Sequence, residues 1–395
     1  MVSSNRPDCT TGLLKFLEDP RYPSVGPHLR FLGLIGLWRP KNSNFKRFKQ
    51  FHFYVTILFF CSQYVKCLIS MNSDSVMLIL KYAPFHLGIA KSCYFRKDCK
   101  EWEKFIDFMS SIERKQLAKK DEEYEVILKE YIKRSRRVTY FFWGLAFFSN
   151  FSIFSEPYQY NQIVENGTSI YQHIFDGYTP FSWEPPGYYA SMAIETVLGL
   201  TVSAYVITWD TLVVTMMIFF AGQLKITRLK CVQTIDLSSR SKSHENIVKC
   251  HIFYKDLIKY QKKFNSLISA SMFIYLVVIS VNLGVCIIQI AKIEDDLGTL
   301  ISSCEFVLAC LIQLLLFYWH ANEVTEESKL VSYGTFESDW VDSDKKLQKE
   351  VALLGLTTTK IFVFKAGPFN VMSLATFISI LRGSYSFFTL LSETN

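Results

Sequence analysis

The stretch GPFNVMSLATFISILRGSYSFFTLL, residues 367–391, contains a single charged side chain, Arg382. About 20 consecutive apolar residues are enough for a helix to cross a bilayer, and this stretch meets that length. Pro368 lies near its start, where the missing N–H of proline costs a helix least. The sequence therefore predicts a membrane-spanning helix close to the end of the chain.

This helix is not uniformly apolar, because small and polar side chains recur in it every three or four residues and so share one stripe. They are Ser373, Thr376, Ser379, Gly383, Ser386, Thr389 and Glu393. Two interpretations are open: a face that lets helices pack closely, or the wall of a water-filled pore. In a pore, Leu390, one turn from Glu393, would form a hydrophobic gate that closes by dewetting.

The rest of the chain has the composition of a polytopic membrane protein, with 50% hydrophobic and 16% aromatic residues among 395. Six more apolar stretches precede the last one. They are residues 52–70, 76–95, 138–154, 188–221, 267–290 and 300–320. We therefore expect an all-α membrane protein with seven transmembrane helices, of which the fourth is long enough to project beyond the bilayer.

Lysine and arginine fix the expected orientation, because they accumulate in cytoplasmic loops. They are frequent before the first span and after the second, fourth and sixth, whereas 71–75 and 157–187 contain none. The second of these loops contains Asn166-Gly-Thr, an N-glycosylation acceptor. The pattern predicts a cytosolic N-terminus and an extracellular C-terminus, the reverse of a G-protein-coupled receptor.

No sequence pattern indicates an enzyme, a metal site or a cofactor. The chain lacks a Gly-rich phosphate loop, His-Glu-x-x-His and Gly-x-Ser-x-Gly, and its ten cysteines match no zinc spacing. Three acidic residues fall within predicted spans, where an ionisable group is a functional candidate. For Asp210 we favour a structural role near the cytosolic end of its helix, while the roles of Glu195 and Glu305 stay open.

Two sets of residues resemble insect odorant receptors. The first resembles the family's C-terminal helix: Ala366-Gly367, Ser373, Thr376-Phe377, Leu381, Ser384-Tyr385-Ser386-Phe387 and Leu390-Leu391. The second is similar to the family's link between helices six and seven: Glu326-Glu327-Ser328, Tyr333 and Trp340. The resemblance implies a subunit of an odorant-gated, non-selective cation channel in the plasma membrane of olfactory sensory neurons.

The resemblance further implies tetramers in which span seven of each subunit lines a central pore, and a partnership with the shared odorant co-receptor. The loop 222–267 lacks the longer insertion associated with that co-receptor, so the chain resembles a ligand-tuned subunit. The expected organisation is a single subunit over 1–395. It comprises a cytosolic segment (1–47), spans one to four (48–222), spans five and six with cytosolic anchor helices (223–366), and the pore-lining span (367–395).

The resemblance also implies where the ligand site lies, because the family's pocket is in the outer half, between spans two, three, four, five and six. An apolar pocket with few polar groups suits a small volatile molecule. The candidates are Tyr82, Phe85, His86, Trp143, Phe147, Phe148, Phe151, Met192, Thr196, Tyr275 and Ile279. A hydroxyl of Tyr82, Thr196 or Tyr275 would orient an ester, alcohol or ketone. Each aromatic residue could instead face lipid or pack between helices.

Three other functions remain open at this point. A gustatory-type channel would share the topology and mechanism, although the last helix is more similar to odorant receptors. A metabotropic seven-helix receptor is disfavoured by the predicted orientation. A secondary transporter is disfavoured because the sequence shows no inverted repeat and no pair of broken helices.

Overall fold

A computed structural model describes residues 16–38, 43–70, 73–119, 121–160, 164–165, 168–169, 171, 173–175, 177–182, 184–291, 293 and 297–393. Its helices are α1 (Gly26–Leu34), α2 (Ser43–Ser70), α3 (Ser73–Lys81), α4 (Ala83–Lys97), α5 (Cys99–Lys119), α6 (Glu122–Tyr160), α7 (Gly187–Val232), α8 (Arg240–Ala291), α9 (Leu297–Phe336), α10 (Lys345–Thr358) and α11 (Leu374–Glu393). Two short antiparallel hairpins complete it: β1 (Val164–Glu165) with β2 (Thr168–Ser169), and β3 (Lys365–Ala366) with β4 (Asn370–Val371).

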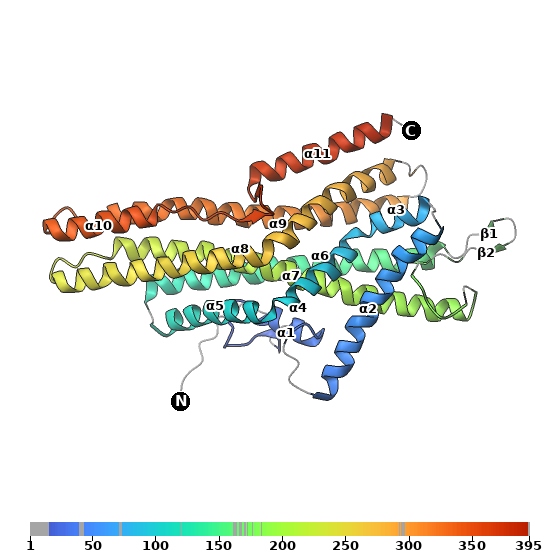
Figure 1. Ribbon diagram of the computed structural model, residues 1–395, viewed down its shortest axis with the longest axis horizontal. Coiled ribbons are helices and arrows are strands. Elements are labelled where there is room, and N and C mark those ends of the chain that lie inside the picture. The colour runs from blue at the N-terminus through green and yellow to red at the C-terminus, as the bar shows by residue number, and fades with distance from the viewer. Residues whose placement is uncertain are drawn as a thin grey trace.

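Helix α7 lies at the centre of the bundle and packs against α4, α6 and α9 (Figure 1). From Thr208 to Leu224 all of its side chains are buried. An apolar helix of a membrane protein can be covered by other helices or by lipid, and this one is covered by α4, α6 and α9. The other long helices form the layers around it.

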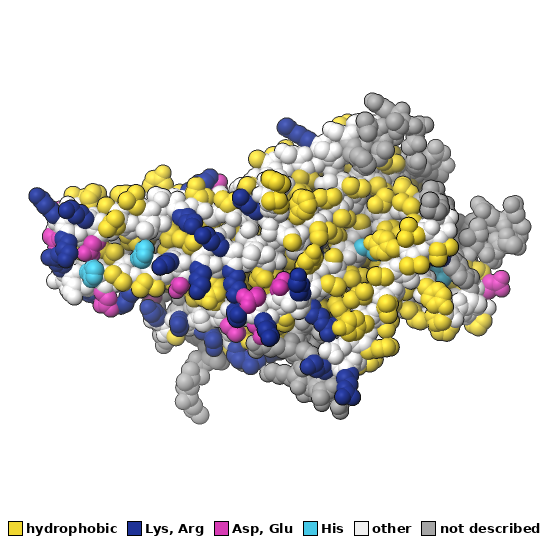
Figure 2. All heavy atoms as spheres, in the orientation of Figure 1, with side chains coloured by type: hydrophobic (Ala, Val, Ile, Leu, Met, Phe, Trp, Pro, Cys, Tyr) yellow, Lys and Arg dark blue, Asp and Glu magenta, His cyan; other side chains and the backbone are white. Residues whose placement is uncertain are grey.

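Five of the described helices are long and apolar enough to cross a membrane. They are Phe45–Ser70, Glu122–Ser155, Gly187–Val232, Arg240–Ala291 and Leu300–Phe336. Figure 2 shows apolar side chains covering the part of the molecule around α2, whereas charged side chains gather toward the end that holds α10. Large exposed apolar side chains on α2, such as Leu58 and Leu68, suit contact with lipid tails. The expectation of a helical membrane protein is confirmed in its helix content and in these five candidate spans. The count of seven spans and the orientation stay predictions.

The stretch 76–95 is not one continuous helix, because the chain breaks at Tyr82 between α3 and α4. Pro84 follows the break and has no N–H to offer the carbonyl of Leu80. Asn282 on α8 supplies the missing donor: its amide Nδ2 lies 2.6 Å from the Leu80 carbonyl oxygen and 3.0 Å from that of Lys81. A side chain of the neighbouring helix α8 therefore donates to the backbone carbonyls at the break, as the interior of a membrane requires.

At the polar end, α10 packs against the extensions of α8 and α9. Asp344 begins α10 by accepting hydrogen bonds from the backbone N–H groups of Lys346 and Leu347, a typical N-cap. The chain then returns along the bundle to a turn at Gly367, whose φ of +72° favours glycine. This turn redirects the chain into α11, which leaves the bundle at an angle (Figure 1).

Candidate ligand-binding site

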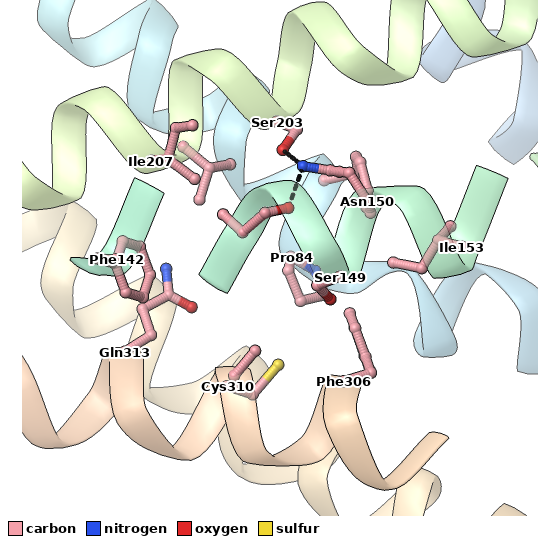
Figure 3. Close-up of a pocket in the computed structure, with 14 residues that line it drawn as sticks. Pro84, Phe142, Ser149, Asn150, Ile153, Ser203, Ile207, Phe306, Cys310 and Gln313 are labelled. Carbon is pink, nitrogen blue, oxygen red and sulfur yellow. Dashed lines mark hydrogen bonds between the residues drawn. The ribbon is translucent and has the colours of Figure 1, made fainter. Parts of the chain in front are cut away.

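A cavity of about 70 Å³ lies between α4, α6, α7 and α9 (Figure 3). A cavity needs about 10–15 Å³ of such volume to hold one water molecule, so this cavity has room for several atoms of that size. Its wall is mostly apolar. The lining residues are Pro84, Phe85, Phe142, Ala146, Ser149, Asn150, Ile153, Ser203, Val206, Ile207, Phe306, Ala309, Cys310 and Gln313. A few polar groups in an apolar wall are what a small-molecule site requires.

Two amide side chains supply most of the polarity of this wall. Asn150 on α6 donates through Nδ2 to the Ala146 carbonyl and to the Ser203 hydroxyl on α7, both at 2.6 Å. Gln313 on α9 donates through Nε2 to the carboxylate of Asp210. Both amides are thereby held in one orientation by the protein.

Behind Gln313 lies a buried ion pair, in which the Lys91 ammonium on α4 is 2.6 Å from the Asp210 carboxylate on α7. Each side chain is only 3% exposed. The rings of Trp209, Tyr275 and Phe317 surround the ammonium, with centroids 5.0, 4.4 and 5.6 Å away. Aromatic faces stabilise a desolvated cation. The three rings and the Asp210 carboxylate together surround the Lys91 ammonium. The pair links the three helices that form one wall of the cavity.

A second cluster, next to the cavity, is aromatic and centres on Phe175, which comes from the loop before α7. Its ring centroid lies 5.1 Å from that of Phe85 and 5.4 Å from that of Tyr82. Glu195 holds this loop, because its carboxylate accepts the backbone N–H groups of Ile174 and Phe175 at 2.9 and 3.1 Å. The carboxylate left open by the sequence thus positions a loop that inserts an aromatic ring into the bundle.

The structure brings some of the expected ligand-site residues together. Tyr82, Phe85 and Met192 are buried in the cluster around Phe175. Phe85 also lines the cavity, and Tyr82 lines a smaller adjoining one of about 20 Å³ that shares Ile153 and Phe306 with it. His86 packs at the edge of the cluster, 5.3 Å between ring centroids from Phe60.

Other expected residues lie elsewhere. Phe147, Phe148 and Phe151 are 67%, 65% and 70% exposed on the outer face of α6. Trp143 packs against Phe31 of α1 and donates to the Thr211 hydroxyl at 3.1 Å. Within one chain, this sets the four α6 residues apart from the cavity.

The remaining candidates lie deeper. Tyr275 and Ile279 are buried on α8 in the main core, on the side of the Lys91 ammonium. Among the described residues, the buried hydroxyls of Tyr275 and Thr196 and the Nε2 atom of His86 have no hydrogen-bond partner. These three groups therefore keep unused hydrogen-bonding capacity inside the bundle.

Sequence reasoning missed Lys91, Gln313 and Phe175. Lys91 stands within the apolar stretch 76–95, close to the lysine- and arginine-rich loop that follows it, so its charge reads as part of that loop. Gln313 is a lone amide in an apolar run, which is a usable signal for a buried polar contact. For Phe175 the sequence gives no signal, because its position depends on the path of a loop.

The expected pore residues lie on α11. The Ser386 hydroxyl donates to the Arg382 carbonyl at 3.0 Å, and the Thr389 hydroxyl donates to the Ser386 carbonyl at 2.9 Å. Ser386 and Arg382 are exposed, and Thr389 is half-buried. The side chains of Leu390 and Glu393 lie outside the described part, as does Asn166 between β1 and β2.

The fold and the cavity together define a helical membrane protein with a mostly apolar cavity between its helices. The family described as "7tm Odorant receptor" matches residues 80–385. The chain therefore belongs to the 7tm odorant receptor family.

Curated relatives agree with this assignment. The chain is 27% identical over 221 residues to Odorant receptor 10 of Aedes albopictus, covering 55% of this chain and 57% of that one. It is 29% identical over 144 residues to Odorant receptor Or2 of Anopheles gambiae, covering 36% and 38%. It is 27% identical over 168 residues to Odorant receptor 42a of Drosophila melanogaster, covering 42% and 41%. These matches span about half the length of the relatives, or less.

The fold is similar to that of the insect olfactory receptor OR5 from Machilis hrabei, with a TM-score of 0.77, 14% identity, and coverage of 93% of this chain and 97% of that one. The structure of OR5 in complex with eugenol gives a TM-score of 0.79 at 14% identity, with coverage of 94% and 98%.

Proposed function

We propose that this chain is a ligand-tuned subunit of an odorant-gated, non-selective cation channel, and not an enzyme. The observation that supports the channel most is the uncovered face of α11. Ser379, Gly383 and Ser386 are exposed on it, while Phe377 and Ile380 pack against the core. Lipid does not reward exposed hydroxyls, so this face suits water or other subunits.

The cavity between α4, α6, α7 and α9 is the proposed odorant site. Burial of apolar area, worth about 25 cal/mol per Å², would supply most of the affinity for a small volatile molecule. The relative OR5 was solved in complex with eugenol, which supports a small organic ligand here. Tyr82, Phe85, His86 and Met192 would shape the site through the cluster around Phe175. Thr196 and Tyr275 would offer hydroxyls, and Ile279 an apolar wall.

The four expected aromatic residues on α6 would not contact the odorant. They are Trp143, Phe147, Phe148 and Phe151. Since Phe147, Phe148 and Phe151 face outward in one chain, they would act where α6 meets lipid or a neighbouring subunit. Trp143 would act by fixing α1 against α6.

The proposed topology has seven spans with the N-terminus in the cytosol and the C-terminus outside. Five spans are the long helices already described; α3 with α4, and α11, would provide the other two. The lysine- and arginine-poor loop 157–187 would be extracellular, with Asn166 glycosylated. The location would be the plasma membrane of olfactory sensory neurons.

The proposed assembly is a heterotetramer with the odorant co-receptor. Large apolar side chains stay exposed at the polar end of the molecule, among them Tyr333, Phe336, Leu353 and Leu356. A water-exposed patch of this kind usually marks a contact with another chain. Subunits would meet at this anchor, formed by α8, α9 and α10.

The proposed gate is the outer part of α11, where Ser386, Thr389, Leu390 and Glu393 would line the path for cations. α9 carries Cys310 and Gln313 in the cavity wall, and α11 packs against α8 and α9. A ligand that displaces α8 and α9 would therefore move α11 and widen the ring of Leu390.

The test is current recorded from cells that express this chain with the co-receptor, with the co-receptor alone as control, across a panel of volatiles. Currents that require both chains and persist when G-protein signalling is blocked would support the proposal. Block of the current would favour a metabotropic receptor, and ligand-dependent uptake without current would favour a transporter. Currents from this chain alone in response to soluble tastants would favour a gustatory-type channel.

A further inference from the structure

The amide of Gln313 is fixed in one orientation by the charges behind it. Its Nε2 donates to Asp210, and the 2.6 Å contact with Lys91 holds Asp210 as a carboxylate, which can only accept. A free glutamine amide can turn over and exchange its donor and acceptor ends. Here the NH₂ end must face Asp210, so the carbonyl oxygen faces the cavity. In Figure 3 this oxygen of Gln313 points toward the space between Cys310 and Pro84.

The amide of Asn150 is fixed in the same sense. Both of its N–H groups are used, one by the Ala146 carbonyl and one by the Ser203 hydroxyl. Its Oδ1 atom is left over as an acceptor. Within the described part of the chain, neither this oxygen nor the Gln313 oxygen has a hydrogen-bond partner.

The remaining polar groups of the wall do not reverse this balance. The hydroxyls of Ser149 and Ser203 can donate or accept, and serines in helices commonly donate to their own backbone. The Cys310 thiol is a weak donor, and its sulfur lies 4.0 Å from the side-chain amide oxygen Oδ1 of Asn282. The fixed groups of the cavity are therefore two acceptors.

We propose that this cavity selects ligands that donate a hydrogen bond, namely small alcohols and phenols, over ketones, esters and ethers of the same skeleton. Asp210 and Lys91 are positioning residues for this selectivity, since they act through Gln313 and do not line the cavity. The inference rests on the proposed function of the cavity as the odorant site. It narrows the ligand class that the sequence left open.

The first test compares ligands that differ only in donor capacity, using the full chain with its co-receptor. Two pairs with identical skeletons are 1-phenylethanol with acetophenone and 2-hexanol with 2-hexanone. The alcohol of each pair should activate at about 5- to 10-fold lower concentration, the ratio that one net hydrogen bond gives. Equal potency, or a more potent ketone, would overturn the inference. Silence toward both would count against the proposed function itself.

The second test changes the ligand selectivity by substituting residues that lie outside the cavity. The double substitution Lys91→Met with Asp210→Asn removes both charges together, and an amide at position 210 accepts either orientation of Gln313. The alcohol-to-ketone potency ratio should then fall toward one. Gln313→Met removes the acceptor itself and should lower the ratio in the same way.

The matched control for the double substitution neutralises a surface pair on α6 outside the cavity, Lys129→Met with Glu125→Gln, whose charged atoms are 2.6 Å apart. This variant should keep the ratio of the unmodified chain. A merely structural role for Lys91 and Asp210 would lower the size of all currents and leave the ratio unchanged, which would contradict the positioning role. If the double variant fails to reach the cell surface, the alcohol-to-ketone potency ratio of the Gln313→Met variant is compared with that of the unmodified chain. Equal ratios in these two chains would overturn the inference.

Discussion

At the scale of single residues, the candidate site is organised by side chains that are far apart in the sequence. Asp210 could be recognised as an ionisable group within a span, but its partner Lys91 lies 119 positions away. Lysine near the end of an apolar stretch normally belongs to the cytosolic loop, whereas Lys91 is buried against Asp210. Only the packing of α4 against α7 reveals the pair.

Removing one member of this pair should destabilise the protein more than removing both. Asp210→Asn leaves a buried ammonium without its counter-charge, which typically costs about 3–5 kcal/mol. We expect a clear fall in the thermal unfolding temperature of the detergent-solubilised protein for Asp210→Asn, and a smaller fall when Lys91→Met is added. A double variant as unstable as the single one would contradict the assignment of an ion pair.

Elements were predicted from the sequence more completely than the site was. Long apolar runs gave the membrane helices, because such runs have no other way to be buried. The break at Tyr82 was not predicted, since Pro84 reads equally as a tolerated kink in a membrane helix. The aromatic residues of 138–154 occupy every side of α6, so periodicity could not tell that Phe142 faces the cavity while Phe151 faces outward.

The break between α3 and α4 gives a prediction at this scale. Asn282→Leu removes the donor to the Leu80 carbonyl, and a buried unsatisfied group costs about 1–3 kcal/mol. We expect a lower unfolding temperature for this variant. Pro84→Ala restores an N–H beside the break, so Asn282→Leu should cost less in that background. Equal costs in both backgrounds would show that Asn282 does not compensate for Pro84.

The contact between α5 and the segment before α1 predicts a pH dependence. The Glu113 carboxylate accepts the Ser24 N–H at 3.2 Å and the Tyr131 hydroxyl at 3.0 Å. Burial raises the pKa of Glu113 to about 7, against 4.5 in its unperturbed state. The folded protein therefore holds this proton more tightly, so the stability from Glu113 is complete below about pH 4.5 and is lost as the pH rises through about 7.

Glu113→Gln keeps the shape of the side chain and cannot ionise. The unfolding temperature of the unmodified protein should fall from pH 5 to pH 8 relative to that of the variant, and the two curves should be closest at the acid end. The measurement is thermal unfolding in detergent at a series of pH values. Parallel curves would mean that Glu113 does not titrate in this window.

At the scale of the whole molecule, the single chain leaves two surfaces uncovered that the proposed assembly would cover. They are the hydroxyl-bearing face of α11 and the apolar side chains around Tyr333 and Leu356 at the polar end. The sequence could predict the α11 stripe, but not which side of the helix the core would cover. In the structure α11 packs on α8 and α9 through Phe377, Ile380 and Ser384, which leaves Ser379 and Ser386 uncovered.

The assembly gives a prediction of its own. Replacing Tyr333 and Leu356 together by aspartate should leave the monomer folded, since both side chains are exposed. It should abolish co-purification with the co-receptor and reduce odorant-evoked current at least tenfold, because charged groups are disfavoured in the core of an interface. Normal association and current would place the subunit interface elsewhere.

The most direct test of the channel is chemical access to α11 while the protein conducts. Single cysteines at Ser379 and Ser386 are compared with single cysteines at Phe377 and Ile380, and the unmodified chain controls for its own ten cysteines. A charged, membrane-impermeant thiol reagent is applied with odorant present. Currents should change irreversibly for the variants at Ser379 and Ser386 and stay constant for the other two. Modification of Phe377 and Ile380 instead, or of none of the four, would contradict an ion path along the uncovered face of α11.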